Sequence, residues 1–289
     1  MKKIAFVIYR KWAYEIFKNI MAFQKENCNF TVSLLILTPN AEFKTEEFKD
    51  FTNIFIVEGN DHAKITFILA ENEIDVVCYY SWSWLIKEPI LSKYVCLCLH
   101  PSPLPKYRGG SPIQNQIING ELDSAVSVFR MGKGLDDGDI YKQLPMSLSG
   151  TIDDIFARMI NLGTIITQQF ILDFIGNKVI FTPQLFLEKN LPLKRRTPQQ
   201  SEIFLKKVLS LSYIELYNMV RSLLDPYPNV FISFPNARLF IQEIIPYKDI
   251  PLDGIVLNET SLQTINQKNF PLYLHLSDGY AFITKYKII

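Results

Sequence analysis

The chain carries almost no net charge and few of the glycines from which phosphate-binding loops are built. Its 30 Lys and Arg nearly balance its 29 Asp and Glu, and a formal charge of +1 gives no overall field that attracts nucleic acid or a membrane surface. Only 12 of its 289 residues are glycine, and neither a Gly-x-Gly-x-x-Gly nor a Walker sequence occurs. A dinucleotide-binding or ATP-binding fold is therefore disfavoured.

Cysteine and long apolar runs are also scarce. The four cysteines, at positions 28, 78, 96 and 98, have no Cys-x-x-Cys spacing, so no metal site is expected. Reduced thiols in a cytoplasmic protein explain them, and Cys28 and Cys78 are expected to be buried. No apolar run approaches the roughly 18 residues of a membrane span, and the apolar run at the amino terminus lacks a small-residue cleavage site. The sequence predicts a soluble, cytoplasmic protein with no membrane partner.

The first 130 residues alternate between apolar runs of strand length and amphipathic stretches of helix length. Strands are predicted at 4–9, 31–37, 54–57, 76–80, 94–100 and 125–131. Helices are predicted at 12–24, 45–51, 62–71 and 112–119, with a long one at 152–176. This order predicts an α/β fold with a mostly parallel, Rossmann-like sheet and helices on both of its faces. Ligand sites in such folds lie beyond the carboxyl ends of the strands.

The composition of the sequence changes beyond residue 180. Several prolines and the basic run Lys194-Arg195-Arg196 mark a connection of the kind that lies on a protein surface. A helix near 213–224 and a series of short apolar runs follow. We therefore predict a first domain over 1–180, a linker over 181–200 and a smaller, β-rich domain over 201–289.

Two glycine-containing loops hold the residues best suited to chemistry. The predicted strand 94–100 ends on His100 and breaks into a proline-rich loop at 101–110, and Gly-Leu-Asp-Asp-Gly-Asp follows at 134–139. Because side chains alternate along a strand, Cys98 and His100 share one face, about 7 Å apart. Asp136 lies 36 residues after His100, where a carboxylate can orient the imidazole. Spacing alone does not separate Asp136 from the two other acids of its loop.

These loops resemble the signature of the folate-dependent formyltransferases, a family that includes methionyl-tRNA formyltransferase and the sugar N-formyltransferases. The resemblance extends over most of residues 1–230, and its motifs are His-Pro-Ser-Pro-Leu-Pro-Lys-Tyr-Arg-Gly (100–109), Ile-Ile-Asn-Gly-Glu (117–121) and Met-Gly-Lys-Gly-Leu-Asp-Asp-Gly-Asp (131–139). It implies that 10-formyltetrahydrofolate is the formyl donor and that the catalytic positions are 98, 100 and 136. The family has Asn at position 98, where this chain has Cys98.

Formyl transfer to an amine needs a base for the amine proton, donors for the oxyanion that forms, and a proton for the departing folate nitrogen. His100 suits the role of base, because an imidazole titrates near neutrality. The resemblance selects Asp136 as the residue that orients it. The alternatives are a structural histidine at the start of a loop and a turn-forming carboxylate.

Cys98 leaves three interpretations open. A thiol is a weaker hydrogen-bond donor than an amide, and the loss of one oxyanion donor typically costs about 2.7–4 kcal/mol. In the first interpretation other donors, such as His100 or a backbone N–H, serve the oxyanion. In the second the activity is weak, lost or redirected. In the third Cys98 is a nucleophile that His100 activates.

The resemblance also indicates where the substrates bind. The segment Ser81–Ile86 corresponds to the family's pterin slot, which the loop of Asp136 closes on the other side. Within it we select Ser81, Trp82, Trp84, Leu85 and Ile86, with core packing as the alternative for Trp82. Basic residues near the same sheet edge suit a diphosphate or a carboxylate, with ordinary surface charge as their alternative. These are Arg10, Lys106, Arg108, Arg195 and Arg196.

The charge of the last domain bears on the acceptor. Residues 201–289 contain 8 Lys and Arg and 8 Asp and Glu, a net charge of zero, whereas a domain that clamps tRNA is expected to have a basic face. We therefore predict transfer to a nucleotide-linked amino sugar, as used for surface polysaccharide such as lipopolysaccharide, and no nucleic acid partner. The alternatives are methionyl-tRNA formylation and a non-catalytic relative that binds folate or a nucleotide. Apolar segments late in the chain offer a face for a homodimer.

Overall fold

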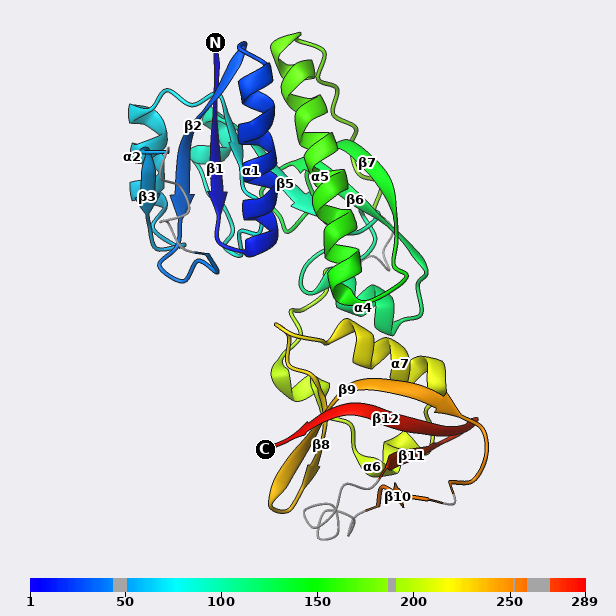
Figure 1. Ribbon diagram of the computed structural model, residues 1–289. Coiled ribbons are helices and arrows are strands. Elements are labelled where there is room, and N and C mark those ends of the chain that lie inside the picture. The colour runs from blue at the N-terminus through cyan, green and yellow to red at the C-terminus, as the bar shows by residue number, and fades with distance from the viewer. Residues whose placement is uncertain (44–50, 187–190, 252, 259–270) are drawn as a thin grey trace. The chain divides into compact units, whose positions relative to one another are not determined.

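A computed structural model describes the chain except for residues 44–50, 187–190, 252 and 259–270 (Figure 1). The chain divides into two compact units. The first comprises Met1–Pro112, Asp123–Ser147 and Phe156–Leu193, and the second comprises Ile113–Leu122, Leu148–Ile155 and Lys194–Ile289. The domain boundaries drawn from the sequence, at 1–180, 181–200 and 201–289, stay a prediction.

The first unit is built on a seven-stranded sheet with the strand order β3-β2-β1-β4-β5-β6-β7. Its strands are β1 (Lys2–Ile8), β2 (Phe30–Leu37), β3 (Ile54–Ile56), β4 (Val76–Cys78), β5 (Val95–His100), β6 (Asp123–Arg130) and β7 (Ile140–Ser147). The first five pair in parallel, and β6 and β7 are added antiparallel at one edge. The predicted mostly parallel sheet is confirmed.

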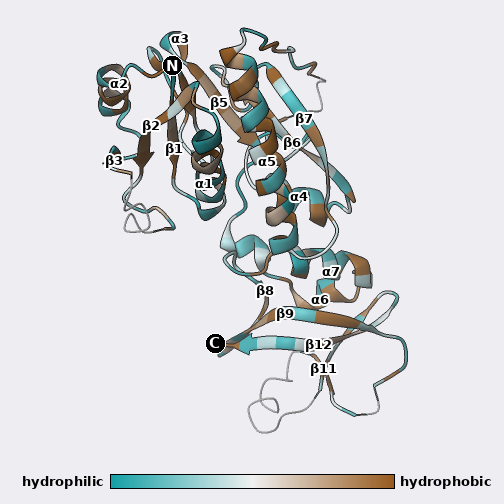
Figure 2. Cartoon of the chain, turned by 45° about the horizontal axis from the view of Figure 1, so that its top comes forward, coloured by the Kyte–Doolittle hydropathy of each residue, from teal (hydrophilic) through white to brown (hydrophobic). Residues whose placement is uncertain are grey.

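The central strands are apolar on both sides because helices cover both faces of the sheet (Figure 2). Every side chain from Ile4 to Ile8 in β1 is at most 1% exposed. On one face lie α1 (Lys11–Glu26) and α5 (Ile152–Ile175). Gly163 of α5 fits there without a side chain, because a Cβ would meet Ile16 of α1 and Leu99 of β5.

The opposite face is covered by α2 (His62–Glu71) and the short α3 (Ile90–Lys93). Ile65, Ile68 and Leu69 of α2 and Ile90 of α3 pack with strand residues in one buried cluster. Cys96 belongs to that cluster, so the side of β5 that carries it faces α2 and α3. The predicted helices on both faces are confirmed.

The long helix α5 bears on the expectation that the chain has no membrane span. By length and mean hydropathy it is the one helix, among the residues that the structure describes, that reaches the level of a spanning segment. Met159, Ile166 and Phe170 are nevertheless at most 1% exposed. These side chains lie in the core, whereas Ile165 and Leu172 of the same helix are each 45% exposed.

The second unit contains a five-stranded sheet with the order β10-β11-β12-β9-β8. Its strands are β8 (Val230–Phe234), β9 (Ala237–Tyr247), β10 (Ile255–Val256), β11 (Leu272–Leu276) and β12 (Gly279–Ile288). Its helices are α4 (Pro112–Ile118), whose first residue belongs to the first unit, α6 (Leu205–Val208) and α7 (Tyr213–Ser222), and a 3-10 turn spans Pro198–Ser201. The smaller, β-rich carboxyl-terminal region is thus confirmed.

A buried arginine ties the second unit together. The Arg221 guanidinium, near the end of α7, donates from Nη1 to the carbonyl oxygens of Leu148 (2.6 Å) and Gly150 (2.9 Å). Its Nε donates to Asn218 Oδ1 at 2.9 Å, and burial lowers the pKa of Arg221. The side chain therefore fixes the segment that leads into α5.

The structure corrects several expectations. Strand β7 and the short helices α3 and α6 did not emerge from the sequence patterns. The helix expected at 45–51 lies almost wholly outside the described residues. Cys78 is buried as expected, but the expectation for Cys28 is wrong, because that residue is exposed.

Candidate active site

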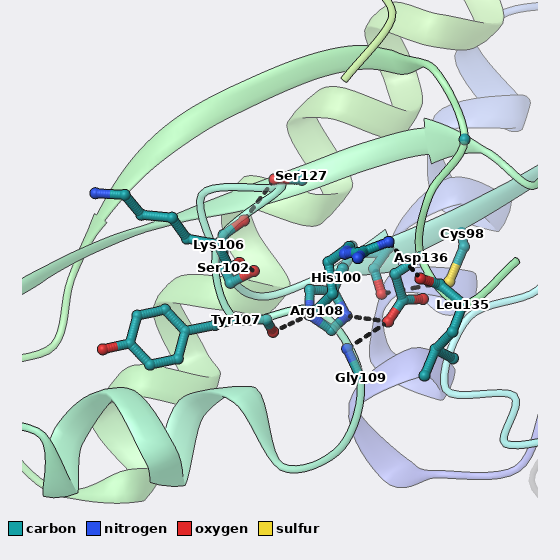
Figure 3. Close-up of polar contacts among 12 residues, drawn as sticks. Cys98, His100, Ser102, Lys106, Tyr107, Arg108, Gly109, Ser127, Leu135 and Asp136 are labelled. Carbon is teal, nitrogen blue, oxygen red and sulfur yellow. Dashed lines mark hydrogen bonds and ion pairs between the residues drawn. The ribbon is translucent and has the colours of Figure 1, made fainter. Parts of the chain in front are cut away.

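His100 is the last residue of β5, at the carboxyl end of the parallel part of the sheet. Cys98 precedes it by two residues, and both side chains lie beside Asp136 (Figure 3). The shared face predicted from strand alternation is therefore observed. His100 is nearly buried, and its side chain keeps only 8% of its surface exposed.

The loop that follows β5 returns to the imidazole. The Nε2 atom of His100 lies 2.9 Å from the backbone carbonyl oxygen of Tyr107, a residue with φ of +57°. A carbonyl oxygen only accepts hydrogen bonds, so Nε2 carries a hydrogen and donates it. This leaves Nδ1 as the ring nitrogen that is available for proton transfer.

Nδ1 faces the carboxylate of Asp136. Asp136 Oδ2 lies 3.4 Å from Nδ1 and accepts the Gly109 N–H at 2.9 Å. Gln184 holds the backbone of the acidic loop, since its Nε2 donates to Asp136 O at 3.0 Å. The hydrogen of the neutral imidazole is held by Nε2. The contact between Nδ1 and Oδ2 is therefore attractive when a second proton lies between these two atoms.

The two other acids of the loop have different surroundings. Asp139 forms an ion pair with Arg130 at 2.6 Å. Asp137 packs against Gly132 and Gly134, where a Cβ would collide with its carboxylate, and it lines a groove of about 630 Å³ together with Tyr94 and Arg130. Of the three carboxylates, Asp136 is the one that contacts His100.

The environment of Cys98 favours a neutral thiol. Burial raises the pKa of the Cys98 thiol well above its ordinary value, and the charge of Asp136 adds to the rise. The sulfur lies 3.7 Å from the carbonyl oxygen of Leu99. A nucleophilic cysteine needs a thiolate, so this site disfavours the interpretation of Cys98 as a nucleophile.

The segment predicted to hold the pterin follows β4 at the same sheet edge. Ser81, with φ of +65°, accepts the backbone N–H groups of Tyr9 (3.3 Å) and Arg10 (3.2 Å) through its hydroxyl. Its side chain therefore joins the ends of β1 and β4. Ile86 is buried, whereas Trp84 and Leu85 are exposed.

Trp82 is partly buried and packs beside the core of the first unit. Its ring packs against the cluster under α2 and lies 4.9 Å from the Trp84 ring and 6.2 Å from the Tyr79 ring, between centroids. The indole Nε1 of Trp82 and the hydroxyl of Tyr79 are buried without a hydrogen-bond partner among the described residues. Buried donors of this kind are normally satisfied, so a water enclosed by the protein would complete them.

The basic side chains predicted to bind the acceptor are distributed over both units. Arg10 forms an ion pair with Glu42 at 2.9 Å. Arg108 lies over the Phe186 ring, 4.4 Å from its centroid, and donates to Leu135 O at 3.4 Å, next to Asp136. Lys106 is exposed in the same loop.

Arg195 and Arg196 belong to the second unit. Arg196 donates from Nη2 to Gln200 O at 2.8 Å, and burial lowers its pKa. The first unit thus assembles His100, Asp136, Cys98 and Arg108 in one place. The binding roles of all five cations, Arg108 included, stay predictions.

Comparison with known proteins reveals a family match around this site. A model described as "Formyl transferase" matches residues 18–167, which is 150 of the 289 residues and includes Cys98, His100 and Asp136. A methionyl-tRNA formyltransferase of Thermosipho africanus is 29% identical over 165 residues, which are 56% of this chain and 51% of that protein. The chain therefore spans about half the length of this curated relative.

Solved structures share the fold. A methionyl-tRNA formyltransferase from Clostridium thermocellum has a TM-score of 0.64 at 23% identity, with 100% of this chain and 99% of that chain covered. A sugar N-formyltransferase from Shewanella sp FDAARGOS_354 has a TM-score of 0.65 at 14% identity, with coverage of 84% and 97%. HypX from Aquifex aeolicus in complex with tetrahydrofolic acid has a TM-score of 0.67 at 14% identity, with coverage of 98% and 43%.

Proposed function

Because this chain belongs to the formyl transferase family, we propose that it transfers the formyl group of 10-formyltetrahydrofolate to an amine. One observation supports the proposal more strongly than the others do. His100 Nδ1 lies 3.4 Å from Asp136 Oδ2 while Nε2 donates to Tyr107 O, at the carboxyl end of β5. The amine must lose a proton during the transfer, and this pair is built to take it.

The roles of the residues follow from their hydrogen bonds. Nδ1 accepts the proton from the amine, because Nε2 already carries a hydrogen and is bound to the Tyr107 carbonyl. The Asp136 carboxylate then faces the imidazolium at 3.4 Å and stabilises its charge. The imidazolium returns this proton to the departing folate nitrogen, so that the bond from the formyl carbon to folate breaks after the bond to the amine has formed. Gly109 N–H keeps the carboxylate in position. General catalysis by a positioned group of this kind contributes about 10²–10⁴-fold in rate.

The formyl donor is proposed to bind along Ser81–Ile86, with the loop of Asp136 on the other side. The exposed Trp84 and Leu85 and the buried Ile86 give this slot apolar walls. The bound donor supplies the formyl carbon, and the protein supplies orientation and the proton acceptor.

For the acceptor we propose a nucleotide-linked amino sugar. The balanced charge of residues 201–289 argues against a tRNA clamp. Arg108, which donates to Leu135 O beside Asp136, and the exposed Lys106 lie in the loop that follows His100, and their charges suit the diphosphate of such a sugar. Surface polysaccharide synthesis, a cytoplasmic location and a homodimer are further parts of this proposal.

Methionyl-tRNA formylation is the second candidate. It is favoured by the name of the Thermosipho africanus relative and by the structural likeness to the Clostridium thermocellum enzyme over the full chain. A non-catalytic binding protein, in which Cys98 has replaced a needed donor, is a third.

An assay with purified chain, 10-formyltetrahydrofolate and two acceptor sets separates these candidates. One set is a panel of nucleotide-linked amino sugars, and the other is initiator tRNA charged with methionine. Release of tetrahydrofolate and the mass of the product are followed together. One formyl group gained by a single sugar supports the first proposal, and formylated methionyl-tRNA moves the second ahead. Tight folate binding without product in either set would overturn the proposed transferase.

A further inference from the structure

A row of polar side chains runs across three strands beneath the His100 loop. His100 of β5 is paired in register with Ser127 of β6, and Ser127 is paired with Gln143 of β7. Partners that lie opposite each other in antiparallel strands point to the same face of the sheet. The three side chains therefore stand side by side on the face that carries the site.

The hydrogen bonds in this row lead from Gln143 to the loop. Gln143 Nε2 has two hydrogens, and it donates one to Leu104 O at 3.0 Å and the other to Ser127 Oγ at 2.9 Å. Ser127 Oγ in turn donates to the carbonyl oxygen of Ser102 (Figure 3). Each hydrogen has one acceptor, so the amide and the hydroxyl fix one another's orientation.

The loop continues the chain of contacts to the imidazole. Ser102 is fully buried, and its hydroxyl donates to Lys106 O at 2.7 Å. The next residue is Tyr107, whose carbonyl oxygen accepts the His100 Nε2 hydrogen at 2.9 Å. The position of that carbonyl decides which ring nitrogen of His100 keeps its hydrogen and which one faces Asp136.

We propose that Gln143 and Ser127 are positioning residues that hold the Tyr107 carbonyl against His100 Nε2 and thereby keep Nδ1 as the proton acceptor. They contact neither substrate nor reacting atoms in this proposal. Their effect is transmitted by the loop backbone between Ser102 and Tyr107. The kinetic consequence rests on the proposed formyl transfer, but the effect on the imidazole tautomer does not.

The test compares Gln143→Met with Gln169→Met. Methionine matches the length of glutamine but donates no hydrogen bond. Gln169 is a suitable control, because its Nε2 donates to Asp173 Oδ1 at 2.9 Å on α5, away from the His100 loop. The first readout is the nitrogen NMR spectrum of the imidazoles, with His100 assigned by its absence in His100→Asn. The chain has 3 histidines, which makes that assignment direct.

We expect the neutral His100 ring of the unaltered protein to be the Nε2–H tautomer, with a slowly exchanging proton. In Gln143→Met we expect a mixture of tautomers and faster exchange, while Gln169→Met leaves the spectrum unchanged. For formyl transfer we expect kcat of Gln143→Met to fall about 10- to 100-fold, with less than about twofold change in KM. An unchanged tautomer in Gln143→Met, or an equal change in Gln169→Met, would overturn the proposal.

A second variant and a double variant test the same proposal independently. Ser127→Ala removes a smaller group, and it is expected to shift the tautomer in the same direction if Gln143→Met does not fold. In a His100→Asn background, Gln143→Met is expected to cause no further loss of kcat, because its effect acts through His100. An additional loss of the same size in that background would show that Gln143 acts by another route. If the unaltered protein transfers no formyl group, the tautomer measurement still decides.

Discussion

Replacing Cys98 with alanine tests whether its thiol takes part in the chemistry or only occupies space beside His100. An ordinary cysteine is about 3% thiolate at pH 7. Burial and the charge of Asp136 raise the pKa of Cys98 further, so its thiolate fraction is smaller still. What Cys98→Ala removes is therefore a weak donor that lies 3.7 Å from Leu99 O.

As a weak donor to the oxyanion, the Cys98 thiol is expected to contribute about 1 kcal/mol to stabilisation of the transition state, the worth of one modest hydrogen bond. Its loss in Cys98→Ala corresponds to a fall in kcat of about fivefold. A covalent nucleophile gives a very different result, because its removal typically lowers kcat by more than about 10³-fold. Rates of formyl transfer at saturating substrate, measured for Cys98→Ala and for Cys98→Ser, distinguish the two cases.

Alkylation provides an independent check with an internal reference. Cys28 is exposed and Cys78 is buried in the same chain. We expect iodoacetamide to modify Cys28 first and Cys98 much more slowly, as followed by peptide mass, with activity unchanged after Cys28 is labelled. Labelling of Cys98 as fast as Cys28, together with a loss of more than about 10³-fold in Cys98→Ala, would refute the reasoning.

Three other substitutions have expected outcomes. Arg221→Met leaves two carbonyl oxygens without their donor and should lower the free energy of unfolding by about 2–3 kcal/mol, measured in urea. Gly138→Ala places a Cβ against the Arg130 carbonyl oxygen, so it should shift the acidic loop, cost about 1–3 kcal/mol in unfolding free energy and lower kcat. Tyr141→Phe removes a hydrogen bond that holds the pKa of Asp173 below its ordinary value. That stabilisation, about 0.5–1 kcal/mol, is complete above the unfolded pKa of about 3.9 and is lost as pH falls through the lower folded pKa, so the wild-type advantage in urea unfolding should shrink as the pH falls below that unfolded value.

The sequence contained enough information to predict the parallel core of the first unit. The apolar runs within β1 and β2 predicted buried strands, and the helix expected at 62–71 matches the span of α2. Strand β7 was missed because Tyr-Lys-Gln-Leu-Pro-Met lacks a clear alternation and contains Pro145. That proline is tolerated because β7 pairs with β6 on one side only within the sheet.

The site was predictable only in part. The family resemblance, now confirmed by the family model, selected Asp136 from three acids, and the structure shows it against His100. The roles of the Tyr107 carbonyl and the Gly109 N–H could not be predicted from the sequence, because nearly every residue has these backbone groups. Gln143 was not selected as a site residue, because its strand, β7, was not predicted from the sequence. Pairing of Arg10 with Glu42 was equally hidden, since it joins residues that are distant in sequence.

The most direct measurement compares formyl transfer by the unaltered chain and by His100→Ala, with the acceptor identified from the two sets described above. Loss of the base is expected to lower kcat by about 10²–10⁴-fold while folate binding persists, because the proposed donor slot lies on Ser81–Ile86. Undiminished transfer by His100→Ala would contradict the assignment of His100 Nδ1 as the proton acceptor.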